Sequence, residues 1–405
     1  MFDIYYQNFR GMNTKLNDIR LASLQSNYDM IVATETWLDQ SVVDGELFSN
    51  RYNIHRRDRH STSLSHKSGG GVLVAVSDRF ESRRIEHYES IYEDLWINIK
   101  YVNNGVSKNL LVCVLYLPPA VSVNTLNAVL DNISSIMQSY RGDVLILGDF
   151  NLGSINWTRN DNSTTRCLPS NYSNELGFSL VDFLSLNNLV QCNSIENHNG
   201  RVLDLVLANF ENIKVTNSLD LLSKLDPHHP VLDIEITEID NTVLISKPVI
   251  RYCFQKANYS TVLSELRRVD WDYELVNCED VNVMVQKFYL ILNKIINSTI
   301  PKSRPKNRIH PVWFTPNLLK LISEKEKIRR KLKIHSNPRD ELELTLAKNR
   351  FDSLMKKCYS HYIMGTEQAI SKAPRILVLR KTAKGCNYPN PFPNVTWQYN
   401  SKFWQ

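Results

Sequence analysis

The fold is decided by Val144-Leu145-Ile146-Leu147-Gly148-Asp149-Phe150-Asn151, an apolar run of strand length that ends at a glycine and two polar residues. In an extended chain, Asp149 and Asn151 project to the same side because they are two positions apart. At the end of a buried strand, the Asp could orient or deprotonate water, and the Asn amide could donate to a phosphoryl oxygen. Taken alone, the segment is equally well explained as a turn in which both side chains cap the backbone.

Three other apolar runs in the first 240 residues also end at a polar side chain. The first run ends at Asn8, the second at Glu35 and another at Tyr116. The edge of a sheet where such strands end is where catalytic groups lie in α/β folds. Singly, Glu35 could begin a helix and Tyr116 could be a core aromatic, so it is the joint order that points to a site.

A lone acidic residue interrupts a further apolar run. Asp204 lies within residues 203–207, and a buried carboxylate there would need a donor, most naturally an imidazole. The segment Asp226-Pro227-His228-His229-Pro230 supplies two candidates. Either histidine could instead be a structural residue, hydrogen-bonded within the fold.

Apolar periodicity predicts two kinds of structure along the chain. Short apolar or alternating runs dominate residues 1–240 and predict strands, with helical periods at 124–137 and 174–186. Several strands follow one another directly, which favours a four-layered α/β sandwich of two packed mixed sheets flanked by helices. We expect this domain to be followed by a mostly helical basic region over 241–372 and a poorly ordered tail over 373–405.

Charge divides the chain at about residue 240. Residues 1–240 hold 19 Lys and Arg against 29 Asp and Glu, whereas residues 241–405 hold 29 against 13. An acidic part suits a metal site and a basic part suits a phosphate backbone, although a solvated helical surface is an equally good explanation of basic residues. The seven cysteines form no Cys-x-x-Cys pair, the N-terminus lacks a secretion pattern, and no apolar run is long enough for a membrane span. We therefore expect an intracellular protein.

Eight motifs between residues 3 and 236 occur in an order that resembles a known family. They are Gln7-Asn8-Phe9-Arg10-Gly11, Glu35-Thr36-Trp37-Leu38, Arg57-Asp58-Arg59, Gly69-Gly70-Gly71-Val72, Tyr116-Leu117-Pro118-Pro119, Gly148-Asp149-Phe150-Asn151-Leu152, Leu203-Asp204-Leu205-Val206-Leu207 and His228-His229-Pro230-Val231. This order resembles the endonuclease/exonuclease/phosphatase superfamily, specifically the apurinic-type endonuclease domain of LINE-like (non-LTR) retrotransposon polyproteins. The resemblance implies a metal-dependent phosphodiesterase that nicks DNA and leaves a 3′-hydroxyl, which primes reverse transcription of the element.

The resemblance also implies roles for individual residues. Glu35 would bind Mg²⁺, with Mn²⁺ as the other candidate ion, and Asn8 would lie beside it, contacting the metal-bound water or the phosphate. Asp149 would orient and activate the attacking water, and Asn151 would hold that water and the phosphate. Tyr116 would donate to the phosphate. In chemical terms, metal and imidazole would neutralise the charge that develops in an in-line displacement at phosphorus.

The last motif departs from the pattern of the family and leaves two candidate histidines. The family has Ser-Asp-His-x-Pro, whereas here a proline follows Asp226, so the metal role of Asp226 depends on how the segment is aligned. The counted match makes His228 the imidazole that Asp204 fixes, whereas a histidine placed directly before proline would be His229. A second departure, Arg10 in place of an Asp, favours the retroelement branch over repair enzymes.

The predicted partners are DNA and, through the basic helical region, the RNA of the element, with the nucleus as the expected location. A non-catalytic nucleic-acid-binding remnant is the alternative, and a phosphoesterase acting on a lipid or nucleotide ranks below both. No Tyr-x-Asp-Asp or Phe-x-Asp-Asp motif of a reverse transcriptase occurs, and Ser401-Lys402-Phe403-Trp404-Gln405 resembles the segment that precedes the polymerase. The chain is therefore expected to be a truncated retrotransposon product.

Overall fold

The computed structural model describes most of the chain up to residue 372. The described residues are 1–49, 51–59, 69–159, 166–237, 239, 251–276, 280–303, 310–335 and 337–372, so the predicted tail over 373–405 lies outside them. The chain divides into two compact units, one of residues 1–242 with 309–405 and one of residues 243–308. The predicted helical region over 241–372 is thus shared between both units.

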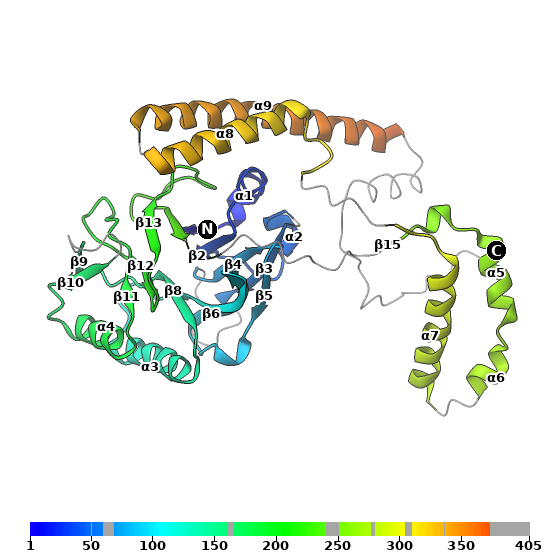
Figure 1. Cartoon of the computed structure of the whole chain (residues 1–405), viewed down its shortest axis with the longest axis horizontal. Helices are drawn as coiled ribbons and strands as arrows, with labels where there is room; N and C mark the ends of the chain where they lie inside the picture. Colours follow the sequence, from blue (N-terminus) through cyan, green and yellow to red (C-terminus); the bar gives the residue numbers. More distant parts are fainter. Residues whose placement is uncertain are drawn as a thin grey trace. The chain divides into compact units, whose positions relative to one another are not determined.

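The first unit contains two large sheets (Figure 1). The strands of one sheet are β1 (Phe2–Asn8), β2 (Met30–Thr34), β3 (Tyr52–Arg57), β4 (Val72–Ser77), β13 (Ile213–Asn217) and β14 (Leu232–Ile236). The strands of the other are β5 (Glu81–Arg84), β6 (Glu93–Asn103), β7 (Val106–Tyr116), β8 (Asp143–Asp149), β9 (Asn156–Arg159), β10 (Cys167–Ser170), β11 (Val190–Gln191) and β12 (Asp204–Ala208).

Both sheets are mixed. The six-stranded sheet has the order β13-β14-β1-β2-β4-β3, and the eight-stranded sheet has the order β5-β6-β7-β8-β12-β11-β10-β9. The β1–β2 and β7–β8 pairs are parallel, and the other neighbours are antiparallel. The predicted pair of packed mixed sheets is confirmed.

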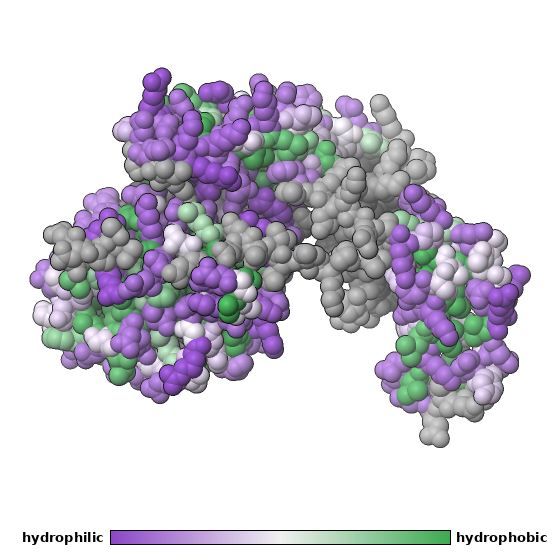
Figure 2. Space-filling model, viewed as in Figure 1, coloured by the Kyte–Doolittle hydropathy of each residue, from purple (hydrophilic) through white to green (hydrophobic). Residues whose placement is uncertain are grey.

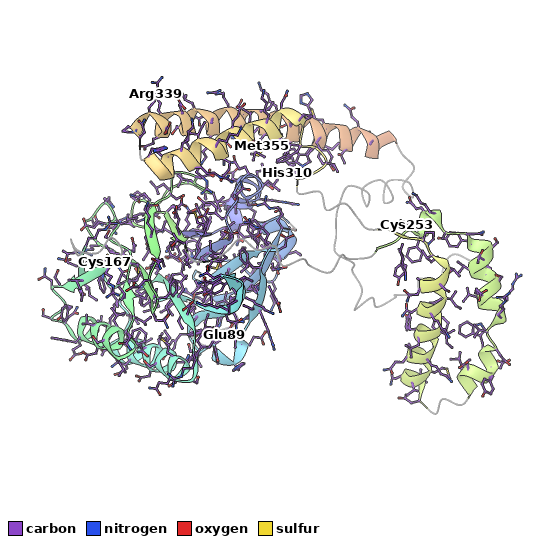
Figure 3. The ribbon with its side chains drawn as sticks, in the orientation of Figure 1. Glu89, Cys167, Cys253, His310, Arg339 and Met355 are labelled. Atoms are coloured by element: carbon purple, nitrogen blue, oxygen red, sulfur yellow. The ribbon has the colours of Figure 1, made fainter. Side chains whose placement is uncertain are left out.

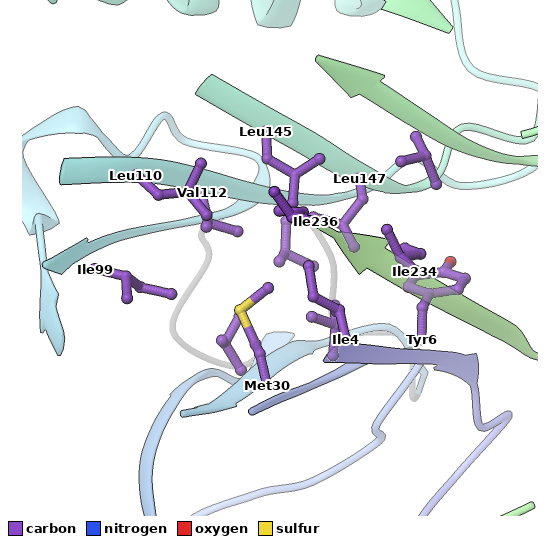
Figure 4. Close-up of a cluster of buried hydrophobic side chains, with 14 of the residues drawn as sticks. Ile4, Tyr6, Met30, Ile99, Leu110, Val112, Leu145, Leu147, Ile234 and Ile236 are labelled. Carbon is purple, nitrogen blue, oxygen red and sulfur yellow. The ribbon is translucent and has the colours of Figure 1, made fainter. Parts of the chain in front are cut away.

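The main core lies between the two sheets (Figure 4). Ile4 and Tyr6 of β1 point into it together with Leu145 and Leu147 of β8, whereas Tyr5 packs on the opposite face of its sheet. This alternation follows from the two-residue period of a strand, so a slip of one residue would turn the apolar set away from the core. The hydrophobic pattern therefore fixes which face of each sheet a given side chain lies on, including the polar side chains at the ends of the strands.

Helices cover both outer faces and complete the four layers. The helices are α1 (Leu16–Ser23), α2 (Asp44–Leu47), α3 (Val123–Ser139) and α4 (Glu175–Leu186). Ile19 and Leu47 belong to the cluster on the outer face of the six-stranded sheet, and Leu126 and Leu180 belong to the cluster on the outer face of the eight-stranded sheet. The Ser122 hydroxyl caps α3 by accepting from the Thr125 amide, as expected of a good N-cap residue. The helical periods predicted at 124–137 and 174–186 correspond to α3 and α4.

A helical hairpin, α8 (Pro316–His335) and α9 (Pro338–Lys372), belongs to the same unit as the sandwich. Leu318 and Ile322 of α8 pack with Phe351 and Met355 of α9, and Leu21 of α1 joins this cluster (Figure 3 labels Met355). Figure 2 shows hydrophilic side chains over most of the visible surface of the hairpin. Because the hairpin packs against α1, it belongs to the same compact unit as the sandwich and not to the second unit.

Two basic residues of α8 serve as internal counter-charges. Lys325 is 1% exposed, and its Nζ lies 2.8 Å from Asp220 Oδ2 and 3.3 Å from Gln25 Oε1. Arg329 Nη2 lies 3.3 Å from Asp3 Oδ2, and its guanidinium lies over the Tyr28 ring at 5.4 Å. Part of the basic surplus therefore neutralises the acidic sandwich instead of facing solvent.

The Asp220–Lys325 pair should make the hairpin essential to stability. Burial raises the pKa of Asp220, but Lys325 and Lys348 lower it by more, so the net shift is downward. Asp220→Asn leaves Lys325 buried without its ion pair, and we expect the free energy of unfolding to fall by about 3–5 kcal/mol. Lys331→Met, at an exposed position of α8, should change it by less than about 0.5 kcal/mol. Urea unfolding of the full chain measures both variants.

The same pair predicts the direction of the pH dependence. Because the pKa of Asp220 is lower in the folded than in the unfolded state, its contribution to stability is present above the unfolded pKa and is lost as pH falls through the folded pKa. The loss of stability on acidification below about pH 4 should be smaller in Asp220→Asn than in the wild type. Equal acid sensitivity of the two proteins would contradict the internal counter-charge.

The second unit, residues 243–308, is small and mostly helical. Its elements are β15 (Arg251–Tyr252), α5 (Tyr259–Arg268), α6 (Trp271–Val276), α7 (Val281–Thr299) and β16 (Lys302–Ser303). The Trp271 and Phe288 rings meet with centroids 5.4 Å apart, and Lys287 Nζ lies 3.2 Å from Glu274 Oε2. Among the described residues of the whole chain, we find no helix with the length and apolar character needed to cross a bilayer.

Candidate active site

The central strands of the eight-stranded sheet bring three polar residues into register. Tyr116 at the end of β7 pairs with Asp149 at the end of β8, and Asp149 pairs with Asp204 at the start of antiparallel β12. Gly148 has a positive φ, and a Cβ there would lie 1.8 Å from the Leu115 carbonyl oxygen. The glycine before Asp149 is thus required by the close approach of β7 and β8, and not only by a turn.

Asn8 joins the two sheets at this point. Its side chain is 1% exposed, and Nδ2 donates to Glu35 Oε1 at 3.0 Å and to Asp149 Oδ2 at 3.0 Å. Glu35 follows β2 with φ of +49°, a left-handed backbone conformation that non-glycine residues seldom adopt. The parallel pairing of β1 and β2 places Asn8 opposite Thr34, and this register brings the Glu35 carboxylate within reach.

His229 occupies the position beside both buried aspartates. Its Nδ1 lies 3.0 Å from Asp204 Oδ2, and its Nε2 lies 3.8 Å from Asp149 Oδ2. Asp204 also accepts a 2.5 Å hydrogen bond from the Tyr6 hydroxyl at its other oxygen. The carboxylate of Asp204 therefore fixes one edge of the imidazole and leaves Nε2 turned toward Asp149.

His228 points elsewhere because of the turn that begins at Asp226. The Asp226 side chain accepts from the His228 amide at 2.8 Å, and its carbonyl accepts from the His229 amide at 3.2 Å. His228 is exposed, and its ring lies 4.7 Å from that of His198. Asp226 itself forms a 3.0 Å ion pair with Arg10. The structure therefore places His229, the histidine directly before proline, beside Asp204, and it gives Asp226 a cationic partner.

Burial and like charges dominate the electrostatics of the site. Burial, together with the carboxylates of Asp204 and Glu35, raises the pKa of Asp149 well above its usual value. Burial alone would lower the pKa of His229, but Asp204 and Asp149 raise it to about 9. Burial and the nearby carboxylates also raise the pKa of Tyr116, so its phenol remains a proton donor at neutral pH. The site thus combines several carboxylates with the imidazole of His229 and the phenols of Tyr6 and Tyr116.

Three of these side chains could hold a metal ion. Donor atoms of Glu35, Asp149 and His229 lie within 4.8 Å of one another. Carboxylate oxygens suit hard divalent cations such as Mg²⁺ and Mn²⁺, and an imidazole nitrogen suits softer ions. Because Nδ1 of His229 is committed to Asp204, the two carboxylates and Nε2 are the groups that remain for a ligand.

Comparison with protein families connects this geometry to a known group. A family model described as "Endonuclease-reverse transcriptase" matches residues 110–231, the segment that holds Tyr116, Asp149, Asp204 and His229. The matched segment lies within the sandwich domain and includes its central strands β8 and β12 and most of β7. The matched segment does not include Asn8 or Glu35, which the fold brings to the same site. No curated protein matches the sequence.

Several solved structures have a similar arrangement over the sandwich. The endonuclease domain of TRAS1, a telomere-specific non-LTR retrotransposon, is 12% identical, with a TM-score of 0.40, and the match covers 58% of this chain and 98% of that domain. The catalytic domain of Xenopus laevis APE2 is 14% identical, with a TM-score of 0.41 and coverage of 59% and 92%. The 3′ phosphatase NExo from Neisseria, bound to product DNA hairpin, is 14% identical, with a TM-score of 0.38 and coverage of 58% and 100%.

Two features of this site were not evident from the sequence. Tyr6 serves Asp204 as a second donor, and its only sequence signal is its place two residues before Asn8 on the same face of β1. Asn151 has φ of +52°, and its Nδ2 donates to the Leu117 carbonyl at 2.8 Å, so one amide hydrogen holds the ends of β7 and β8 together.

Proposed function

We propose that the sandwich domain, residues 1–240, is a metal-dependent phosphodiesterase that nicks DNA. The observation that carries this proposal is the convergence of Asn8, Glu35, Asp149, Asp204 and His229 in one polar cluster, in which hydrogen bonds link Asn8 to two carboxylates and Asp204 to His229, and His229 Nε2 lies 3.8 Å from Asp149. These residues come from strand ends and loops far apart in the sequence. This cluster favours catalysis over the alternative of a binding remnant, because burying several like-charged carboxylates together costs stability, and such costly arrangements concentrate at functional sites.

The chain's own residues supply the proton chemistry of the proposed reaction. Asp149 orients the attacking water and withdraws its proton as the water approaches phosphorus. His229, whose ring is held by Asp204, donates through Nε2 to a nonbridging phosphoryl oxygen, and Tyr116 donates to the phosphate from the neighbouring strand. Asn8 and Asn151 hold Asp149 and the water in place. Attack of water on phosphorus breaks the P–O3′ bond, and the leaving 3′-oxygen takes a proton from solvent. The products are a 3′-hydroxyl and a 5′-phosphate.

We assign the metal to the carboxylate side of the cluster. Glu35, with Asp149 beside it, offers the oxygen ligands that Mg²⁺ prefers, and Mn²⁺ fits the same donors. When bound, the ion supplies charge neutralisation at the phosphoryl oxygens. We propose Asn8 as the amide that positions Glu35 for this role, since it donates to that carboxylate. We do not assign Asp226 to the metal, because its carboxylate is engaged by Arg10.

We further propose that the nick primes reverse transcription of a retroelement. Support comes from the endonuclease–reverse transcriptase description of the matching family model and from Arg10, which replaces an acidic residue in the first motif. DNA is the proposed substrate in the nucleus. Exposed cations of the hairpin, including Lys320, Lys327 and Arg330, are the proposed contact for element RNA.

Nicking of supercoiled plasmid tests the proposed function. With Mg²⁺ the full chain should convert supercoiled circles to nicked circles, and excess EDTA should abolish the conversion because the carboxylate ligands then hold no ion. Adding Mn²⁺ after EDTA removal should restore it. Nicking that persists in EDTA would contradict the metal assignment, whereas salt-sensitive DNA binding with no nicking under any of these conditions would select the non-catalytic remnant.

A further inference from the structure

An exposed tryptophan lies two residues after Glu35 of the candidate metal site. The Trp37 residue is 44% exposed, although its neighbours Thr36 and Leu38 are buried. Trp37 has φ of +53° and Glu35 has φ of +49°, so two bulky residues share a strained, left-handed backbone within three positions. Strain of this kind persists only where the surrounding structure holds it, and it concentrates at functional sites. The Trp37 amide donates to the Gly70 carbonyl at 2.9 Å.

The indole rests on a seat made by two glycines. A Cβ on Gly11 would lie 2.8 Å from Trp37 Cε3, so one part of the ring lies directly on the Gly11 backbone. A Cβ on Gly69 would lie 3.6 Å from Trp37 Nε1. The side-chain amide of Asn13 donates through Nδ2 to the Trp37 carbonyl at 2.9 Å, which holds the backbone of Trp37 in place. The ring is therefore fixed before any ligand arrives, which lowers the conformational entropy that binding must overcome.

Two arginines flank this seat. Arg10 adjoins Gly11, and its side chain is 53% exposed beside Asp226. On the other side, the guanidinium of Arg59 lies 3.3 Å from the position of a Cβ on Gly69 and 5.5 Å from the centre of the Tyr116 ring. Arg10 is paired with Asp226, and Arg59 is paired with Glu93 at 2.6 Å. The fixed aromatic face, close in sequence to a site for phosphodiester chemistry, is therefore the feature that suits a base-stacking platform on nucleic acid.

An ordinary surface hydrophobic residue would look different. Phe178 on α4 is also about half exposed, at 51%, but it lies within a regular helix with negative φ, and its ring meets the edge of the Tyr172 ring at 5.8 Å. Exposed single apolar residues of that kind need no functional explanation. Trp37 differs from Phe178 in its left-handed backbone, in the contact of its ring with Gly11 and Gly69, and in its place two residues after Glu35.

We propose that Trp37 stacks on the nucleobase next to the scissile phosphate and so directs the enzyme to DNA whose bases unstack easily. This inference rests on the proposed function, because it names the substrate class of the same site. Stacking requires that base to leave its neighbours, and unstacking is least costly at a mismatch, a junction or a flexible step. Trp37 is therefore a residue for substrate recognition and takes no proton.

Binding to matched and mismatched duplexes in EDTA tests the proposal without depending on cleavage. The wild type should bind a duplex with one central mismatch more tightly than the fully paired duplex of the same sequence. Trp37→Leu should weaken binding to the mismatched duplex about 5- to 150-fold and remove the preference. Trp37→Phe, which keeps an aromatic face, should retain most of it. Phe178→Leu is the matched control and should change neither dissociation constant.

A second readout separates stacking from a structural effect. In plasmid nicking, Trp37→Leu should raise KM by a similar factor and leave kcat within about threefold, since uniform binding is lost and the chemistry is not. Unchanged mismatch preference in Trp37→Leu, with nicking intact, would overturn the inference and leave the proposed function standing. Absence of nicking in the wild type would count against the proposed function, while the binding measurements would still decide the role of Trp37.

Discussion

His229→Asn should lower the rate of DNA nicking by about 10²- to 10⁴-fold, whereas His228→Asn should leave it within about threefold. An Asn at 229 keeps a donor for Asp204, but it loses the Nε2 group that faces Asp149 in the site. His228 is exposed and its ring contacts His198, so its loss removes no group from the cluster. The two substitutions are chemically identical and one residue apart.

Single-turnover nicking under saturating enzyme measures this difference, because it reports the chemical step and not product release. Thermal unfolding of both variants shows whether either has lost its fold. Equal loss of activity in the two variants, with both folded, would argue for a general effect on the loop. A greater loss of nicking activity in His228→Asn than in His229→Asn would reverse the assignment. His228, the histidine that matches the family motif by position, would then be the catalytic imidazole.

Asp149→Asn should reduce nicking by at least about 10³-fold and should not weaken the fold. Asp149 is fully buried, and it shares its surroundings with the carboxylates of Asp204 and Glu35. A neutral amide relieves this repulsion and can still accept from the Asn8 side chain through its own oxygen. The residue that carries the chemistry is therefore one whose charge costs the folded protein stability, as is common at active sites.

In Asp149→Asn, the temperature of thermal unfolding without metal should rise or stay unchanged. The rate of nicking with metal should fall by the stated factor. DNA binding in EDTA should remain within a few fold of the wild type. An Asp149→Asn protein that unfolds at a much lower temperature would show that the carboxylate holds the fold together. An active Asp149→Asn protein would show that another group prepares the water.

The sandwich could be predicted from the sequence because its signals are local. Strand-length apolar runs, the two-residue period and the polar residues at the ends of β1, β2, β7 and β8 all follow from neighbouring positions. The pairing of Asp204 with an imidazole was also predicted, because a buried carboxylate on an apolar strand needs a donor. In the structure the imidazole beside Asp204 is that of His229, the alternative to His228, with 3.0 Å between Asp204 Oδ2 and His229 Nδ1.

What could not be predicted depends on contacts between distant segments. The choice between His228 and His229 is made by the turn in which Asp226 accepts from both following amides, and sequence spacing does not show which way such a turn faces. Likewise, Lys325 belongs to a helix whose basic residues suggest a nucleic-acid surface, yet its ammonium group is buried against Asp220. Periodicity identifies the buried face of a helix, but not the charge that it will meet.

The most direct test of the central claim is the chemistry of the nick itself. Plasmid nicked by the wild type in Mg²⁺ should be extended by a DNA polymerase without any other treatment, because the proposed cleavage leaves a free 3′-hydroxyl. The same plasmid incubated with Asp149→Asn should give no extension. Nicks that require a phosphatase before extension, or extension equal in wild type and Asp149→Asn, would contradict a DNA-nicking phosphodiesterase built on Asp149, Glu35 and His229.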